Sequence, residues 1–302
     1  MANELTFQVL TLPSGDWNQV RDRFKQVEDL GFEMATTGDH FVDWTEPSRP
    51  WLEAWTLLAG IARETSKLRL ATYVTQIPMR NPALLARMAL TVDHISEGRL
   101  DVGLGTGLTI DPTYDMMGIP NWENAERVAR LREYVQIVRQ LLSNEVSSFE
   151  GEYYKVTEAT MRPVSVQRPH PPIVVAALGP VMLRIAAQHA DKWNTMSFAK
   201  SFEAQFGELR ERFQAVDAIC AETGRDPATL GRSVLMFDPD SRATGGSVSY
   251  YTSENLFVEQ VTRLAEVGYR EFGLYYPMLD EQMPAFERIA TDIIPQLKRD
   301  LG

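Results

Sequence analysis

The sequence predicts an α/β fold, a (β/α)8 TIM barrel with insertions after strands 4 and 7. Three observations predict it: strand-like and helix-like segments alternate along the chain, eight such pairs occur, and the 302 residues exceed the roughly 250 that this barrel needs. Strict alternation is typical of parallel strands joined by helical crossovers. The competing architecture, an open doubly wound sheet, normally has fewer strands. We therefore expect one barrel domain over residues 1–302.

Eight strands are predicted at residues 5–12, 32–37, 68–75, 100–104, 173–177, 193–197, 233–237 and 271–275. Helices are predicted at 17–30, 51–64, 82–96, 124–142, 181–189, 202–222 and 254–266, and a last helix ends near residue 297. Gly31 suits the C-terminal cap of the first helix. Asn81 suits the N-terminal cap of the third, with Pro82 in its first turn.

Two stretches interrupt the alternation. Residues 146–172 contain an apolar–polar alternation around Gly151, which predicts a β-hairpin, followed by a proline-rich loop. Residues 238–251 are rich in Gly, Ser and Asp and follow the seventh strand. Because loops after barrel strands lie on the catalytic face, this segment is a candidate lid, with an ordinary connection as the alternative.

Composition excludes several classes of protein. The formal net charge of −11 argues against general nucleic-acid binding. The single cysteine, Cys220, allows no intramolecular disulfide and lies in a helical pattern, so we expect a core residue. Four scattered histidines lack metal-ligand spacing. Residues 1–12 do not resemble a signal peptide, and no apolar run is long enough to span a membrane. We expect a cytoplasmic enzyme with a small-molecule substrate, no metal and no membrane partner.

The second predicted strand leads into Asp39 and His40. In a barrel, side chains at the carboxyl ends of strands point into the catalytic mouth. An imidazole there can donate or accept a proton near neutral pH, and Asp39 is the neighbouring carboxylate that could orient it. The alternative is that Asp39 and His40 form a surface or capping pair without a catalytic role.

Two glycine-containing segments could approach a ligand closely. Residues 103–107 lack the third glycine of a dinucleotide-binding fingerprint, and the next helix is expected only about fifteen residues later. We therefore reject a Rossmann dinucleotide-binding fold for this segment. Residues 176–180 precede a helix directly, and free N–H groups at a helix N-terminus bind phosphate. A simple turn is the alternative for this second segment.

Taken together, these segments resemble the bacterial-luciferase-like family of barrel oxidoreductases. The resemblance covers about residues 7–297, and the order and spacing of its parts make it specific. Its carriers are Gly38–Phe41, Arg80–Ala86, Asp93–Gly107, Phe149–Tyr154, Pro171–Ile173, Gly179–Pro180 and Ala190–Asn194.

The family has one branch that uses reduced FMN and oxygen and one that uses the deazaflavin coenzyme F420 for hydride transfer. Asp39, His40, Phe41 and Trp44 resemble the F420 branch, in particular its sugar-phosphate and alcohol dehydrogenases. The resemblance implies that Asp39 binds the cofactor ring, that His40 handles a proton or stabilises charge, and that Trp44 packs over the reacting centre.

Further contacts follow from the resemblance alone. Val74 lies in a bulge of the third strand that supports the ring, with a non-proline cis peptide at Tyr73–Val74. Ring or tail contacts are implied for Gln76, Thr106, Gly107 and Asp111. The phosphate and the far side of the ring are assigned to Ala177, Leu178, Gly179, Val181 and Met182.

One position departs from the family pattern. The dehydrogenases carry a catalytic glutamate directly after Gly-Thr-Gly, where this chain has Leu108, and Ala199 stands near a position where a basic residue clamps a sugar phosphate. We therefore assign neither glucose 6-phosphate nor a simple alcohol. Leu108 and its apolar neighbours in sequence favour a hydrophobic organic substrate, unless those aromatic residues belong to the core. The neighbours are Trp44, Trp51, Met116, Met117 and Trp122.

Three hypotheses follow. The first is hydride transfer between F420 and a small hydrophobic substrate, with His40 and Trp44 at the reacting centre. The second is an FMN-dependent monooxygenase supplied with reduced FMN by a partner reductase. The third is a flavin-binding protein without catalysis. Family members commonly pair through barrel helices, so a homodimer is expected.

Overall fold

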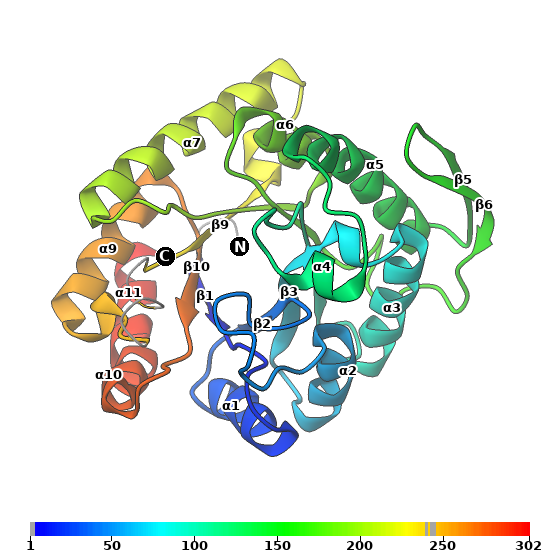
Figure 1. Ribbon diagram of the computed structural model, residues 1–302. Coiled ribbons are helices and arrows are strands. Elements are labelled where there is room, and N and C mark those ends of the chain that lie inside the picture. Colours follow the sequence, from blue (N-terminus) through cyan, green and yellow to red (C-terminus); the bar gives the residue numbers. More distant parts are fainter. Residues whose placement is uncertain (1–3, 239–240, 242–245) are drawn as a thin grey trace.

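The computed structural model describes residues 4–238, 241 and 246–302. Eight parallel strands close into a barrel, which Figure 1 views with the helices around it. In barrel order they are β1 (Thr6–Leu10), β2 (Met34–Asp39), β3 (Arg69–Gln76), β4 (Leu100–Gly105), β7 (Ile173–Ala176), β8 (Lys192–Thr195), β9 (Gly231–Leu235) and β10 (Glu271–Tyr275). Pairing of β10 with β1 closes the ring. The predicted TIM barrel is confirmed.

The helices form the outer layer. They are α1 (Trp17–Asp29), α2 (Ala54–Glu64), α3 (Pro82–Ile95), α5 (Asn124–Ser143), α6 (Pro180–His189), α7 (Phe202–Glu222), α9 (Glu254–Val267), α10 (Met283–Arg288) and α11 (Ile294–Leu301). A π-helical turn, Ile289–Ile293, joins the last two, and short 3₁₀ turns cover Ile77–Met79, Pro227–Thr229, Ser249–Tyr251 and Asp280–Gln282. As predicted, Asn81 caps α3, with its side chain accepting from the Ala83 N–H, and Gly31 ends α1 with φ +86°.

Some predicted boundaries were wrong. The strand predicted at 32–37 lies at 34–39, and the one predicted at 233–237 lies at 231–235. These strands are short and mostly buried, so pairing with neighbouring strands sets their ends. A short helix, α4 (Thr113–Met117), also lies where no helix was expected before residue 124. It is too brief to show helical periodicity and ends at left-handed Gly118, φ +64°.

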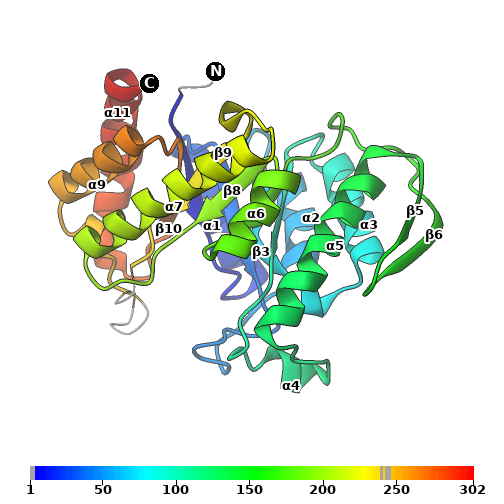
Figure 2. The ribbon, with the colours of Figure 1, turned by 90° about the horizontal axis from the view of Figure 1, so that it is seen from above.

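The insertion after the fourth strand is present as a segment outside the barrel. The predicted hairpin is formed by β5 (Val146–Glu150) and β6 (Lys155–Thr160), which lie beside α5 and α3 (Figure 1). Glu133 of α5 holds its turn by accepting three backbone N–H groups from residues 152–154. Figure 2 shows α4 and the blue loop after β2 projecting from the same end of the barrel. Of the candidate lid at 238–251, residues 239–240 and 242–245 lie outside the described part of the chain.

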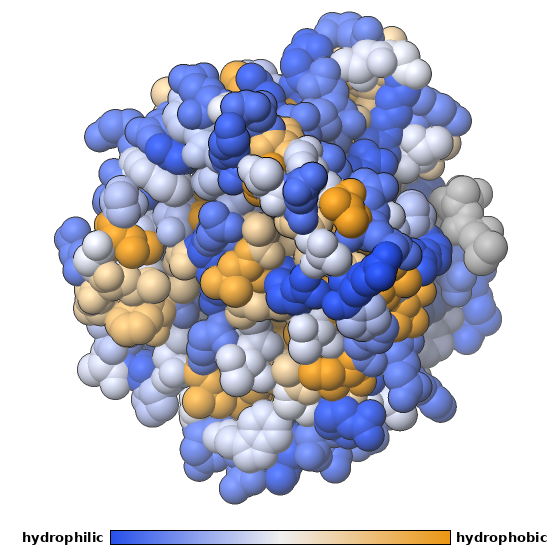
Figure 3. Space-filling model, turned by 90° about the vertical axis from the view of Figure 1, so that its right-hand side faces the viewer, coloured by the Kyte–Doolittle hydropathy of each residue, from blue (hydrophilic) through white to orange (hydrophobic). Residues whose placement is uncertain are grey.

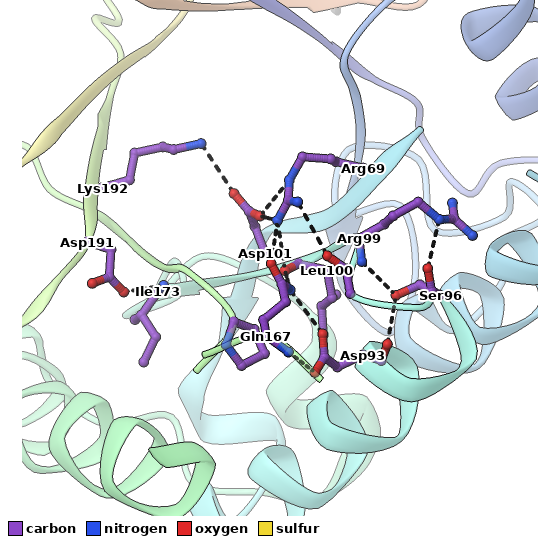
Figure 4. Close-up of polar contacts among 12 residues, drawn as sticks. Arg69, Asp93, Ser96, Arg99, Leu100, Asp101, Gln167, Ile173, Asp191 and Lys192 are labelled. Atoms are coloured by element: carbon purple, nitrogen blue, oxygen red, sulfur yellow. Dashed lines mark hydrogen bonds and ion pairs between the residues drawn. The ribbon is translucent and has the colours of Figure 1, made fainter. Parts of the chain in front are cut away.

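One segment of the family resemblance, residues 93–101, ties a helix end to the strands. Asp93 accepts from the backbone of Val166 and from the side chain of Gln167, which also donates to the Leu100 carbonyl (Figure 4). Arg69 forms an ion pair with Asp101. These contacts support the end of the barrel away from the catalytic mouth, so this part of the motif is structural.

The outer surface is mostly hydrophilic. Figure 3, which faces α3, α5 and the hairpin, shows separate hydrophobic patches within that surface. Cys220 is fully buried, as predicted for a core residue. Among the described residues, no helix is long and apolar enough to cross a membrane.

Candidate active site

A cavity of about 290 Å³ opens at the carboxyl ends of the barrel strands. Its walls come from β3, β4, β7 and β8, from the loops that follow these strands and β2, and from the first turn of α6. The lining residues are His40, Tyr73, Val74, Gln76, Gly105, Thr106, Gly107, Leu108, Ala176, Leu178, Gly179, Met182, Asn194, Thr195, Met196 and Phe198. Apolar side chains form most of this wall, and His40 contributes its imidazole to it.

One wall is an irregular stretch of β3. The peptide bond between Tyr73 and Val74 is cis, as predicted, and the register of β3 against β4 shifts between residues 71 and 75. Val74 faces the cavity there. A side chain at Gly105 would clash with Val74, so glycine at this position of β4 is what lets the bulge approach.

His40 is held by groups from three parts of the chain. Its Nδ1 lies 2.6 Å from Oδ2 of Asp111, which belongs to the loop after β4. Gln76 donates from Nε2 to the same carboxylate oxygen at 2.8 Å. Trp51 donates from Nε1 to the His40 carbonyl at 3.0 Å and meets the imidazole edge-on. Among the described residues, Nε2 of His40 has no hydrogen-bond partner.

A buried chain of hydrogen bonds continues behind Gln76. The Tyr114 hydroxyl donates to Oε1 of Gln76 and accepts from Arg127 at 3.1 Å. Arg127, fully buried on α5, also donates to the Thr106 carbonyl at 2.8 Å. Gly107 has φ +76°, and any side chain there would clash with Tyr114 and Gln76. These contacts fix the amide of Gln76 with its nitrogen toward His40 and Asp111.

Asp39 does not have the orienting role expected for it, because Asp111 holds the imidazole. Both carboxylate oxygens of Asp39 accept from Arg80, at 2.6 and 3.0 Å, and the carboxylate is fully buried. That burial raises the pKa of Asp39 above its usual value, although Arg80 opposes the rise. Successive side chains of a strand project to opposite faces, so a carboxylate at the end of β2 is poorly placed to hold the next residue's ring.

The N-terminus of α6 also borders the cavity. Gly179 is the N-cap of α6 and provides no side-chain cap. Among the described residues, no heavy atom lies within 4 Å of the position that a Cβ would occupy there, apart from its chain neighbours and the backbone of the helix itself. Nearby, the buried Oγ1 of Thr195 has no hydrogen-bond partner among the described residues. An unpartnered hydroxyl and uncapped N–H groups beside one cavity suit a ligand with oxygen acceptors.

The structure brings eight of the predicted residues together in the cavity wall: His40, Val74, Gln76, Thr106, Gly107, Leu178, Gly179 and Met182. Asp39, Asp111, Ala177, Val181 and Trp44 are not in that wall; their contacts with a ligand stay predictions. Sequence reasoning missed six lining residues: Tyr73, Ala176, Asn194, Thr195, Met196 and Phe198. Some signal for them was present, because Ala176, Met196 and Phe198 lie within one residue of the predicted strand ends, whereas Tyr73, Asn194 and Thr195 lie inside the predicted strands.

The apolar residues proposed to contact the substrate do not all lie at the cavity. Leu108 lines the cavity, and Met116 and Met117 are exposed on α4. Trp51 packs on His40, whereas Trp122 lies over the Arg130 guanidinium at 4.2 Å.

Burial opposes ionisation of Asp111, but hydrogen bonds from His40, Thr113 and Gln76 outweigh it and lower its pKa from 3.8 to about 2. Because the pKa of Asp111 is lower in the folded protein than in the unfolded chain, its ionised carboxylate stabilises the fold at pH values above the unfolded-state pKa. That stabilisation is lost as the pH falls through the folded-state pKa. We expect the wild type to exceed Asp111→Asn by about 2 kcal/mol in unfolding free energy at pH 5, and this difference to vanish between pH 4 and 2. Urea unfolding at several pH values measures it; a constant difference would contradict the assignment.

Comparison with known proteins agrees with this geometry. Residues 5–243 match the family model of luciferase-like monooxygenases. An F420-dependent glucose-6-phosphate dehydrogenase from Segniliparus rotundus is 31% identical over 248 residues, 79% of this chain and 70% of the relative. The pyrimidine monooxygenase RutA from a Bradyrhizobium species is 29% identical over 256 residues, 82% of this chain and 68% of the relative.

Two solved structures share the fold. The F420-dependent tetrahydromethanopterin reductase from Methanopyrus kandleri superposes with a TM-score of 0.77 at 21% identity, covering 97% of this chain and 99% of that one. An F420-dependent secondary alcohol dehydrogenase, solved with an F420–acetone adduct, gives a TM-score of 0.78 at 18% identity, covering 95% and 99%.

The closed parallel barrel has a cavity at its mouth with an imidazole in the wall, and the family model and the relatives make this barrel an oxidoreductase. The chain belongs to the luciferase-like monooxygenase family. The family predicted from the sequence motifs is thus confirmed.

Proposed function

We propose that this protein is an F420-dependent oxidoreductase that transfers a hydride between the deazaflavin and a small hydrophobic organic substrate. The observation that carries the proposal is the apolar cavity at the barrel mouth, with His40 in its wall and the bulge at Val74 beside it. The F420-dependent dehydrogenases among the relatives support the choice of cofactor.

The residues of the cavity fit a flat redox ring with a phosphate-bearing tail. Val74 and Met182 supply apolar surface, and the unpartnered Thr195 hydroxyl supplies a polar contact. The uncapped N-terminus of α6 at Gly179 suits a tail phosphate. Contacts from Gln76, Thr106, Gly107 and Leu178 belong to this proposal, as do those from Asp39, Asp111, Ala177 and Val181, which lie outside the wall.

When bound, the deazaflavin supplies or accepts the hydride at carbon, which is the cofactor's own chemistry. The chain excludes water with its apolar wall and handles the proton. His40 takes the proton of the substrate in the oxidative direction and returns it in the reductive direction, a step worth roughly 10²–10⁴-fold in rate. Trp44 is proposed to pack over the reacting centre.

The cavity wall indicates the substrate class. Among its described residues there is neither Lys nor Arg, so a sugar phosphate finds no cationic clamp. Leu108 cannot exchange a proton, and together with Met196 and Phe198 it gives an apolar surface. We therefore propose a hydrophobic ketone, imine or activated alkene, or the corresponding reduced compound, rather than glucose 6-phosphate.

The second candidate is an FMN-dependent monooxygenase that uses oxygen. The relatives named as pyrimidine monooxygenases favour it, and so does the departure of Leu108 from the dehydrogenase pattern. The same cavity would then hold reduced FMN delivered by a partner reductase. We also propose, from the family resemblance, one barrel domain over residues 1–302 that pairs as a homodimer and works in the cytoplasm.

A side-by-side titration with F420 and FMN tests the cofactor. We expect F420 to bind at least about tenfold more tightly, a difference of about 1.4 kcal/mol. Anaerobic oxidation of reduced F420 with a panel of hydrophobic carbonyls, imines and alkenes then tests the reaction. Tighter FMN binding with oxygen uptake would establish the second candidate instead, and binding without any turnover would indicate a non-catalytic flavin-binding protein.

A further inference from the structure

His40 is the cavity group suited to exchange a proton. Among the described residues of the wall, His40 and Tyr73 have titratable side chains. Burial, followed by the charge of Glu271, raises the pKa of Tyr73 well above its usual value. Its hydroxyl donates to Glu271 at 3.0 Å, below the cavity. With leucine at 108, the proton chemistry of this site therefore depends on which nitrogen of one imidazole is free.

We propose that Asp111 is the positioning residue of this site: it holds His40 with a proton on Nδ1 and leaves Nε2 as the nitrogen that exchanges a proton with the substrate. The inference deepens the proposed function and rests on it for the reaction, but the protonation state of the free imidazole does not depend on the cofactor.

The short contact between Nδ1 and the carboxylate requires a proton between them. A separation of 2.6 Å joins His40 Nδ1 to Asp111 Oδ2, and two bare acceptors would repel at that distance. The low pKa of Asp111, near 2, keeps the carboxylate ionised, so the proton resides on the ring. The other oxygen, Oδ1, accepts from the Thr113 N–H at 2.8 Å, which fixes the plane of the carboxylate.

The groups around the His40–Asp111 pair are consistent with a proton on Nδ1 of His40. Gln76 has two amide hydrogens and acceptors for both: Oδ2 of Asp111 at 2.8 Å and the Asp39 carbonyl at 3.2 Å. Its nitrogen is therefore not needed as a donor to Nδ1, although it lies 2.9 Å away. The Tyr114 hydroxyl, bonded to Oε1, prevents the amide from flipping.

The charged and titratable groups near His40 come from several elements. Asp111 precedes α4, Tyr114 lies on it, and Arg127 belongs to α5. Asp39, at the end of β2, and Arg80 form an ion pair and neutralise each other's charge. Asp111 is thus the carboxylate in contact with the imidazole, and it is the group whose loss would change the protonation of His40.

The decisive measurement is ¹⁵N NMR of protein with labelled histidine and no cofactor. Loss of one signal set in His40→Gln assigns His40 among the four histidines. We expect wild-type His40 to be protonated at Nδ1 when neutral, and Asp111→Asn to lose that preference. Asp115→Asn, an exposed carboxylate on α4, is the matched control and should leave the spectrum unchanged. Wild-type His40 protonated at Nε2 would overturn the proposal, as would an unchanged tautomer in Asp111→Asn.

Kinetics provide the second test. With reduced F420 and an active acceptor, Asp111→Asn should lower kcat by roughly 10²-fold or more while KM stays within about threefold, because the ring is then misoriented rather than the substrate unbound. An effect on KM alone would assign Asp111 to binding and overturn the proposal. If F420 fails to bind wild-type protein, the proposed function fails, whereas the NMR result still decides the role of Asp111.

Discussion

Replacing His40 with alanine is expected to lower kcat about 10²–10⁴-fold in an anaerobic assay with reduced F420. The reason is chemical: among the described residues of the cavity wall, no other side chain is placed to replace the imidazole in proton transfer, because Leu108 is apolar and the Tyr73 hydroxyl donates to Glu271. The Kd for F420 should change by less than about threefold, since the imidazole serves the reaction more than binding.

The His40 experiment needs a variant that preserves bulk and one that changes an unrelated histidine. His40→Gln keeps a polar side chain without a titrating nitrogen and should be as slow as His40→Ala. His189→Ala removes a histidine at the C-terminal end of α6, outside the cavity wall, and should retain full kcat. Wild-type turnover in His40→Ala would remove this residue from the mechanism.

Replacing Lys192 with methionine is expected to destabilise the barrel by about 3–5 kcal/mol. Lys192 begins β8 and forms ion pairs with Asp101 and Glu271, both buried (Figure 4 shows the first). Burial lowers the pKa of Lys192, but Glu271, Tyr73 and Asp101 outweigh it and hold that pKa well above the usual value. Without the ammonium, Asp101 keeps its ion pair with Arg69, whereas Glu271 has no other cationic partner among the described residues.

The shift of the urea midpoint measures this effect, and an exposed pair gives the control. Lys155 and Glu150 lie 2.8 Å apart on the hairpin with most of both side chains in solvent. Lys155→Met should therefore change the unfolding free energy by less than about 1 kcal/mol. Adding Glu271→Gln to Lys192→Met should recover part of the loss, because one uncompensated charge is removed. Equal effects of the two lysine substitutions would show that the interior pair is no stronger than the surface one.

Some elements, one long helix and one short strand among them, were predicted with the bounds that the structure shows. The helix at 202–222 and the strand at 271–275 occur with the expected bounds, the helix because Ser201 caps its start and many turns reinforce its period. The second and seventh strands were misplaced by two residues, because short buried parallel strands show no alternation of polar and apolar side chains. The five residues of α4 gave no periodic signal at all.

The candidate site was only partly predictable. Barrel topology and family resemblance identified His40, Gly107 and Gly179, because each follows the end of a strand. The contact between His40 and Asp111 joins residues 71 apart in sequence, and no local pattern indicates it. The sequence offered Asp39 as a possible orienting group for the imidazole through adjacency alone, with a surface or capping pair as the alternative.

The sequence by itself determined the eight-unit barrel and the family, and it predicted the mouth of the barrel as the reactive end, because periodicity, caps and strand-end motifs are local properties of the chain. Only the tertiary structure decided which carboxylate holds the imidazole, which hydroxyl lacks a partner and which charges pair in the interior. Those outcomes depend on which side chains from distant strands face the same enclosed space, and burial there makes every unmatched polar group costly.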